Sequence, residues 1–430
     1  MRIRKAEKRA LALPGPLRHV GRVKNPRFIL DNFPFLAAGA LLTFLSSFGQ
    51  TFFISIFSGE IREGFGLSHG EWGGIYMLGT GASAVIMVWA GGLTDLFRVR
   101  RLGPMIIGGL AVACLCMAYN RSAVLLPFII LMLRFFGQGM TSHIAVVAMA
   151  RWFVAARGRA LSLAALGFSA GEALLPILFA SLMTRIDWHL LWVAGAGVCL
   201  VGAAVLAGLL GRERTPQSHA ATDHSLGMLA RHWTRGEALR HPVFWLMVPA
   251  MLGPGAFNTA FFFHQVHFAE IKGWTHVELV AFFPLYTALS ILSMLGVGWL
   301  QDRLGTVRLI PFFQLPMVAA FAIFAWADGP VAMALGFLFL ALTTGANATL
   351  PNAFWADIFG TAHIGSIKAA VAATMVLGSA IGPGLTGALI DLGLGLERQF
   401  LLIAAYFVLT TALISAAAAR VAAASPARGA

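Results

Sequence analysis

Twelve long apolar stretches, separated by short segments that carry the charges, constrain the fold of this chain more than any other feature. A helix rises 1.5 Å per residue, so about 20 mostly apolar residues cross the hydrocarbon core of a bilayer. The stretches that meet this length are 33–57, 72–94, 102–120, 122–150, 160–184, 188–211, 243–268, 279–301, 309–327, 330–354, 369–390 and 399–419. No soluble fold offers twelve such segments in series, so we predict an all-α membrane protein with twelve transmembrane helices.

The composition agrees with burial in lipid. The chain is 58% hydrophobic and 11% charged, whereas soluble domains carry about 25% charged residues. Cys114, Cys116 and Cys199 lie in apolar stretches and show neither metal-ligand spacing nor a disulfide framework. We therefore predict no metal site and no cofactor. The first apolar stretch is longer than a signal-peptide core and follows about thirty residues of leader, so we expect it to remain as a span.

The positive charges indicate an orientation in the membrane. The net charge is +13, which by itself could suggest nucleic-acid binding. With the N-terminus in the cytoplasm, 25 of the 31 lysines and arginines lie on the inner side, 5 lie on the outer side, and Arg134 lies inside a span. This bias follows the positive-inside rule. We expect a multi-pass protein of the inner (plasma) membrane with both termini cytoplasmic and no nucleic-acid partner.

The longest polar segment divides the chain into two halves of six spans each. Within that segment Thr234-x-x-Glu237 resembles a capping box and predicts a short interfacial helix. The predicted parts are a basic cytoplasmic leader 1–32, an N-terminal half 33–211, a cytoplasmic linker 212–242, a C-terminal half 243–419 and a cytoplasmic tail 420–430.

Each half contains a similar loop after its second span. A Gly-x-Leu-x-Asp sequence ends the span, and an arginine follows six residues after the aspartate. The residues are Gly91, Asp95 and Arg101 in the first half and Gly298, Asp302 and Arg308 in the second. Such parallel repeats are expected when two halves arise by duplication, so the halves are predicted to be pseudo-symmetric.

These loops resemble the signature of the major facilitator superfamily, Gly-x-Leu-Ala-Asp-Arg-x-Gly-Arg-Lys. In the second loop, Arg303 and Gly305 match the arginine and the glycine that follow the aspartate of this signature. Arg134 with the following Gly137-Gln138-Gly139 resembles the Arg-x-x-x-Gly motif of span four. The resemblance implies the major facilitator fold and a carrier of small molecules that we expect to function as a monomer in the bilayer. It also implies that the loop clusters latch the cytoplasmic side when the protein faces outward.

Within the superfamily the sequence is most similar to the oxalate/formate antiporter and monocarboxylate porter group. The stretches that carry this similarity are 151–153, 157–159, 237–240, 244–245 and 365–368. The similarity implies that the substrate is a monocarboxylate or another organic anion, and that transport is coupled to protons or proceeds by exchange.

Arg134 and Glu172 are the only charged residues inside the predicted spans. A charge at the centre of a bilayer costs about 2.5–3.5 kcal/mol on insertion scales, so each must face protein or water. Each lies 13 residues inward of an outer-side arginine, Arg121 and Arg185 respectively, which places both roughly 20 Å deep. We therefore predict an ion pair, either a proton switch in which Glu172 releases Arg134 or a permanent structural pair.

Polar side chains in other spans are candidate substrate contacts. In the superfamily, spans one, four, seven and ten line the central cavity, and Asn258 and Gln265 share a helical face at a spacing of seven residues. Interhelical hydrogen bonding is the alternative role for each uncharged residue. The candidates are Gln50, Arg134, Gln138, Asn258, His264, Gln265 and Asn347.

No enzyme signature is present in the sequence, which has no phosphate-binding loop, nucleophile–base arrangement or metal cluster. We predict an alternating-access secondary transporter of a small organic solute, with no catalytic residues. One alternative is a membrane receptor or assembly factor with a transporter fold. The other is a drug or metabolite exporter, which the sequence Gly167-Phe-Ser-Ala-Gly171 in span five disfavours because such exporters often carry Gly-Pro-x-x-Gly there.

Overall fold

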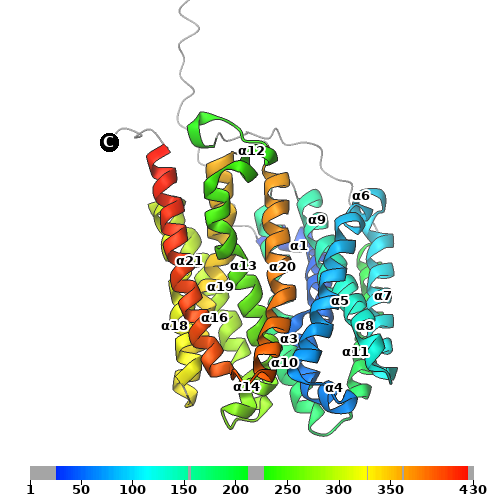
Figure 1. Cartoon of the computed structure of the whole chain (residues 1–430). Coiled ribbons are helices and arrows are strands. Elements are labelled where there is room, and N and C mark those ends of the chain that lie inside the picture. Colours follow the sequence, from blue (N-terminus) through cyan, green and yellow to red (C-terminus); the bar gives the residue numbers. More distant parts are fainter. Residues whose placement is uncertain (1–25, 154–155, 212–226, 327, 361–362, 425–430) are drawn as a thin grey trace, which may run out of the picture.

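The structure is a computed structural model that describes residues 26–153, 156–211, 227–326, 328–360 and 363–424, and the regular elements within these ranges are all helices (Figure 1). Eleven helices of the described chain are long and apolar enough to cross a membrane. A twelfth span is the broken pair Phe33–Gly49 and Thr51–Phe65, which bends by 49°. The predicted all-α fold of twelve spans is confirmed.

The twelve spans follow one another along the chain in the predicted order. The first six are formed by α2 (Phe33–Leu45), α3 (Thr51–Ile54) and α4 (Ser58–Phe65), then α5 (His69–Ala90), α7 (Val99–Tyr119), α8 (Leu126–Leu133) with α9 (Ser142–Trp152), α10 (Arg157–Met183) and α11 (Trp188–Leu209). The last six are formed by α13 (Pro242–Phe263), α15 (His276–Val280) with α16 (Phe283–Leu304), α17 (Thr306–Leu309) with α18 (Leu315–Trp326), α19 (Pro330–Phe359), α20 (Ile364–Asp391) and α21 (Leu396–Ala424). Short helices α1 (Pro26–Asp31), α6 (Leu93–Leu96), α12 (Arg235–Arg240) and α14 (Gln265–Ile271) complete the α-helices of the described residues.

The outer surface of the bundle is apolar, as contact with lipid requires. Val88 and Trp89 of α5 are 77% and 73% exposed, and Leu292 and Leu295 of α16 are also exposed. In water such a surface would be a liability. In a bilayer these apolar side chains contact the lipid hydrocarbon, and the backbone polar groups form their hydrogen bonds within the helices.

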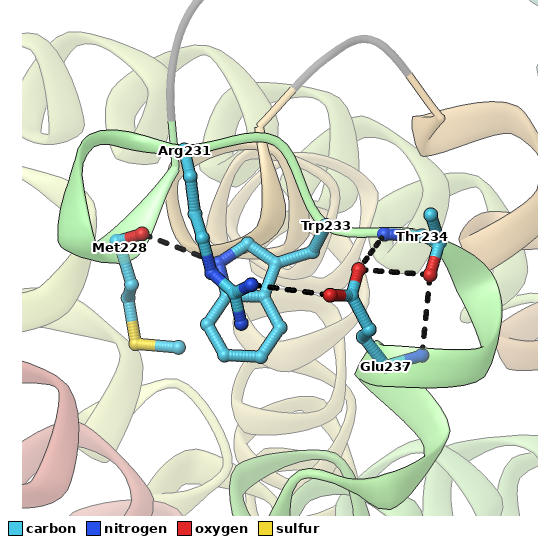
Figure 2. Close-up of polar contacts among 5 residues, drawn as sticks. All are labelled: Met228, Arg231, Trp233, Thr234 and Glu237. Atoms are coloured by element: carbon cyan, nitrogen blue, oxygen red, sulfur yellow. Dashed lines mark hydrogen bonds and ion pairs between the residues drawn. The ribbon is translucent and has the colours of Figure 1, made fainter.

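The described part of the linker packs on the C-terminal half (Figure 2). The predicted capping box is present: the Thr234 hydroxyl accepts from the Glu237 N–H, and the Glu237 carboxylate accepts from the Thr234 N–H at 2.8 Å. Arg231 lies over the Trp233 ring at 3.9 Å and pairs with Glu237 at 3.1 Å. The Trp233 indole N–H donates to the Met228 carbonyl at 3.2 Å. Predicted linker residues 212–226 lie outside the described residues.

We call the end of the bundle that carries α12 the linker face and the end that carries α4 and α14 the far face (Figure 1). The last helix ends at Ala424 on the linker face rather than at the predicted residue 419. Across the middle of the molecule, α5 packs along α20 and α10 packs along α16. These contacts join the two halves.

Polar contacts and aromatic rings close the far face between the halves. Ser68 Oγ and the Gly70 N–H donate to one Asp391 oxygen at 2.6 and 2.8 Å. Trp72 stacks on Phe263 with ring centroids 5.7 Å apart. Among the described residues, the hydrogen bonds between the halves lie at the far face or at mid-depth. The described halves are thus joined by a group of polar contacts at the far face and by the contact of Glu172 with Thr287 at mid-depth.

Candidate functional site

A cavity of about 390 Å³ lies at the middle of the bundle and receives residues from both halves. Its wall is polar at several points and aromatic at others. The lining residues are Gln50, Thr51, Phe52, Gln138, Phe168, Glu172, Pro254, Gly255, Asn258, Thr259, Phe262, Tyr286, Met317, Thr343, Thr344, Asn347 and Met375. A larger hollow of about 720 Å³ has a described wall formed only by residues 96–98, 100 and 101, around the connection between α6 and α7. Because both halves line the central cavity, we take it as the candidate site.

Two irregular helical segments shape the N-terminal side of the cavity. Span one breaks at Gln50, whose backbone is extended (φ −86°, ψ 154°). Span four widens into a π-helix over Arg134–Thr141. The two segments touch through Gly49 and Gly137, where a Cβ on Gly137 would lie 2.6 Å from Gly49 Cα. Helical irregularities of this kind free backbone groups and recur at functional sites.

Arg134 points toward the break in span one. Its Nη1 donates to the Gly49 carbonyl at 3.2 Å and to Thr51 Oγ1 at 3.3 Å. The guanidinium lies 5.5 Å from the centre of the Tyr76 ring, and the Tyr76 hydroxyl is 2.6 Å from Thr51 Oγ1. Arg134 is 1% exposed and is absent from the described cavity wall, and its Nε is buried without a hydrogen-bond partner among the described residues.

Glu172 lies on the cavity wall and faces the other half of the protein. Its Oε2 accepts a hydrogen bond from Thr287 of α16 at 3.1 Å. The described part of the chain holds no ion pair between Glu172 and Arg134, so the predicted pairing is wrong for this conformation. Counting residues gave the two charges the same depth, but depth does not fix the direction in which a side chain leaves its helix.

The other predicted cavity residues fall into two groups. Gln50, Gln138, Asn258 and Asn347 lie on the cavity wall, as expected. The remaining two are placed elsewhere, which corrects the prediction. His264 is bonded to Thr386 at 2.9 Å, and Gln265 donates to the Phe52 carbonyl at 3.1 Å and to Ser55 Oγ at 2.7 Å.

Helix α13 ends at Phe263, and α14 begins at Gln265 after a turn at His264. The seven-residue spacing from Asn258 therefore crosses a helix end, and the shared face that it predicts is lost. Both His264 and Gln265 belong to the far-face closure between the halves rather than to the cavity. Gln265 is fully buried there, at 0% exposure.

Sequence reasoning missed the aromatic part of the wall. Four rings line the cavity, and they form two edge-to-face or tilted pairs: Phe52 with Phe168 at 5.7 Å, and Phe262 with Tyr286 at 5.4 Å. The Tyr286 hydroxyl donates to Thr344 at 3.1 Å. The chain has 34 phenylalanines. An aromatic residue inside an apolar span therefore cannot be recognised from the sequence as part of a binding site.

The predicted gating loops lie on the linker face. Arg303 stacks over the Trp299 ring at 3.8 Å, and the Asp302 and Arg308 side chains are exposed. Gly91 ends α5, Asp95 lies in α6, Arg101 lies in the first turn of α7 and Gly298 lies in α16. A latch formed by these residues remains a prediction.

Comparisons with known proteins agree with this architecture. Residues 39–383 match the family described as Major Facilitator Superfamily. A bacterial homolog of the human lysosomal transporter Spinster, solved inward-facing and unoccupied, is similar with a TM-score of 0.72 at 13% identity, covering 92% of this chain and 98% of that one. The nucleoside transporter NupG is similar with a TM-score of 0.68 at 12% identity, covering 89% and 98%. No curated protein matches.

At these identities the solved structures establish only the fold, whereas the family match spans most of the chain. The match, the twelve spans in two halves and the central cavity between them lead to one conclusion. The chain belongs to the major facilitator superfamily.

Proposed function

We propose that this chain is a proton-coupled secondary transporter that moves a small organic solute across the membrane by alternating access. Membership of the family indicates a transporter rather than an enzyme. The observation that carries the coupling proposal is the position of Glu172. It is the only charged residue on the described cavity wall, and its one described hydrogen bond crosses to the opposite half.

A carboxylate in this position links protonation to the contact between the halves. When ionised, it accepts the hydrogen bond of Thr287 and remains exposed to whatever occupies the cavity. When protonated, it loses its charge and part of its capacity as an acceptor. Proton binding therefore changes both the charge of the site and a contact across the interface, which is what an alternating carrier requires.

We further propose that the linker face is cytoplasmic, since the predicted inner side carries 25 of the lysines and arginines. The halves are fastened at the far face, so this conformation would face inward. The protein would then be a multi-pass protein of the plasma membrane with cytoplasmic termini, and the division into 33–211 and 243–419 would separate the two moving bodies.

Reconstituted protein tests the coupling. A thermal-shift screen of organic acids, amines, amino acids and sugars first identifies a bound solute, because binding to the folded state raises apparent stability. Uptake of that solute into vesicles is then measured with and without a pH gradient. Glu172→Gln should abolish gradient-driven accumulation of that solute, and the exposed Glu63→Gln on α4 should behave as wild type. Unchanged pH-driven accumulation in Glu172→Gln would refute the proposal, and binding without any uptake would favour the receptor alternative.

A second candidate is transport of a monocarboxylate or another organic anion, as the sequence predicts. It is favoured by the unpartnered Nε of Arg134. An anion would have to reach that guanidinium past Thr51, whose hydroxyl now accepts from Arg134 and lines the cavity. If this candidate is correct, carboxylates should stabilise the wild type and lose their effect in Arg134→Ala.

A further inference from the structure

The charge on the cavity wall bears directly on which solute the site can take. Glu172 contributes a carboxylate, and no other described lining residue is charged. Arg134 is shielded, since it is 1% exposed and its Nη1 is held by the Gly49 carbonyl and Thr51 Oγ1. A solute in the cavity therefore meets a negative wall without a compensating cation.

One oxygen of Glu172 is held and the other is available. Thr287 donates to Oε2, and no hydrogen bond to Oε1 is described. Tyr286 of α16 is the other titratable residue on the described cavity wall. No ion pair to Glu172 from any of the described helices packed against α10 is present. The carboxylate thus lacks a protein counter-ion and can take either a proton or a cation.

The remaining wall suits an organic cation. Phe52, Phe168, Phe262 and Tyr286 provide four aromatic rings around the same space. A ring face attracts an ammonium group within about 6 Å of its centre, and the same rings bury alkyl or aromatic substituents. At about 390 Å³ the cavity falls within the range for small organic ligands.

We infer that the transported solute is a small organic cation, such as a protonated amine, and that its nitrogen binds Glu172 in place of the proton. This inference rests on the proposed function and names its substrate class. As the ammonium group arrives, the proton leaves the Glu172 carboxyl group for water, so one positive charge replaces another. The cycle exchanges one monovalent cation for one proton and moves no net charge.

The test uses purified full-length protein and matched probes. The probes are small primary to quaternary amines, carboxylates of the same carbon skeletons and the corresponding neutral amides. We expect the cations to raise the apparent melting temperature and to bind tenfold more tightly for each unit of pH increase while the free carboxyl group is still mostly protonated. In weakly buffered solution over the same pH range, one proton should be released for each cation bound.

Variants separate the binding chemistry from folding. Glu172→Gln keeps the shape and an acceptor for Thr287, and it should lose cation affinity by at least tenfold together with proton release and pH dependence. Glu63→Gln should bind as wild type. The inference is overturned if no cation in the panel binds, if cation binding is independent of pH or survives Glu172→Gln, or if carboxylates bind more tightly than the matched amines. Proton-driven uptake of an uncharged solute or of a carboxylate that depends on Glu172 would overturn this inference and leave the proposed function intact.

Discussion

The contact between Gly49 and Gly137 can be tested by adding a single carbon atom. In Gly137→Ala the new Cβ would lie 2.6 Å from Gly49 Cα and 2.8 Å from Gly49 N. Carbon atoms in contact prefer separations of about 3.5–4.0 Å. Both obstructing atoms are backbone, so span one and span four must move apart by about 1 Å. The Gly49 carbonyl, now 3.2 Å from Arg134 Nη1, would then lie beyond hydrogen-bonding distance.

Two costs follow from that one displacement. Overpacking a tight interface costs about 1–3 kcal/mol. A lost hydrogen bond to a charged group costs about 1.5–3 kcal/mol, and the guanidinium is too buried for water to replace the carbonyl. Because the two effects share one cause they do not add fully, and we expect a total loss of about 2–4 kcal/mol.

Gly139→Ala is the matched control in the same π-helical segment. Its Cβ would meet the Met87 side chain, with Sδ at 2.8 Å and Cγ at 3.0 Å. A methionine side chain can rotate away at small cost, so we expect a loss of at most about 1 kcal/mol.

The buried thiols of Cys114 and Cys199 provide the assay, because a thiol-reactive dye reports their exposure as the protein unfolds on heating. Gly137→Ala should melt several degrees below both the wild type and Gly139→Ala. If the two alanine variants melt at the same temperature, the proposed contact between the two irregular segments does not support the position of Arg134.

Two further perturbations test the far face and the linker. When Ser68 and Asp391 are both replaced by cysteine, an oxidant should join the halves by a disulfide, since the native Oγ and Oδ2 atoms lie 2.6 Å apart. Uptake should stop on oxidation and return with a reductant. Full transport by protein that mass spectrometry shows to carry the disulfide would contradict alternating access. At the linker, donation from the Thr234 N–H and hydroxyl lowers the pKa of Glu237 below its ordinary value of 4.5. The stabilisation of α12 is therefore complete above the ordinary carboxyl pKa and is lost as the pH falls through the lowered one. The hydrogen-exchange rates of amides 235–240, corrected for the intrinsic effect of pH, should rise on acidification in the wild type and stay constant in Glu237→Gln. Equal pH profiles in the two proteins would show that the capping box does not cause the acid sensitivity of α12.

The spans were predictable because the relevant free energies are local. Each apolar segment gains free energy by leaving water, and each charge carries its own cost of entering lipid. The positions of α5, α7, α11 and α16 therefore agree with the predicted spans to within a few residues. The break at Gln50 was not predictable in this way, because no proline marks it and its partner is the π-helix of span four.

The candidate site was predictable only in part. Helical angle and family resemblance placed Gln50, Gln138, Asn258 and Asn347 on the cavity wall. The same reasoning failed for Gln265, since its register with Asn258 depends on a helix that ends at Phe263. The aromatic residues Phe52 and Phe262 could not be distinguished from ordinary apolar residues of a span.

The sequence by itself determined that this chain is a bundle of twelve membrane spans with two charges deep inside it, since hydropathy and charge act residue by residue along the chain. Only the tertiary structure decided where those charges point. Arg134 turns toward a carbonyl freed by the break in span one, and Glu172 turns toward the cavity and Thr287. Depth follows from counting residues, but direction follows from how each helix is rotated and from where its neighbours lose their regular hydrogen bonds.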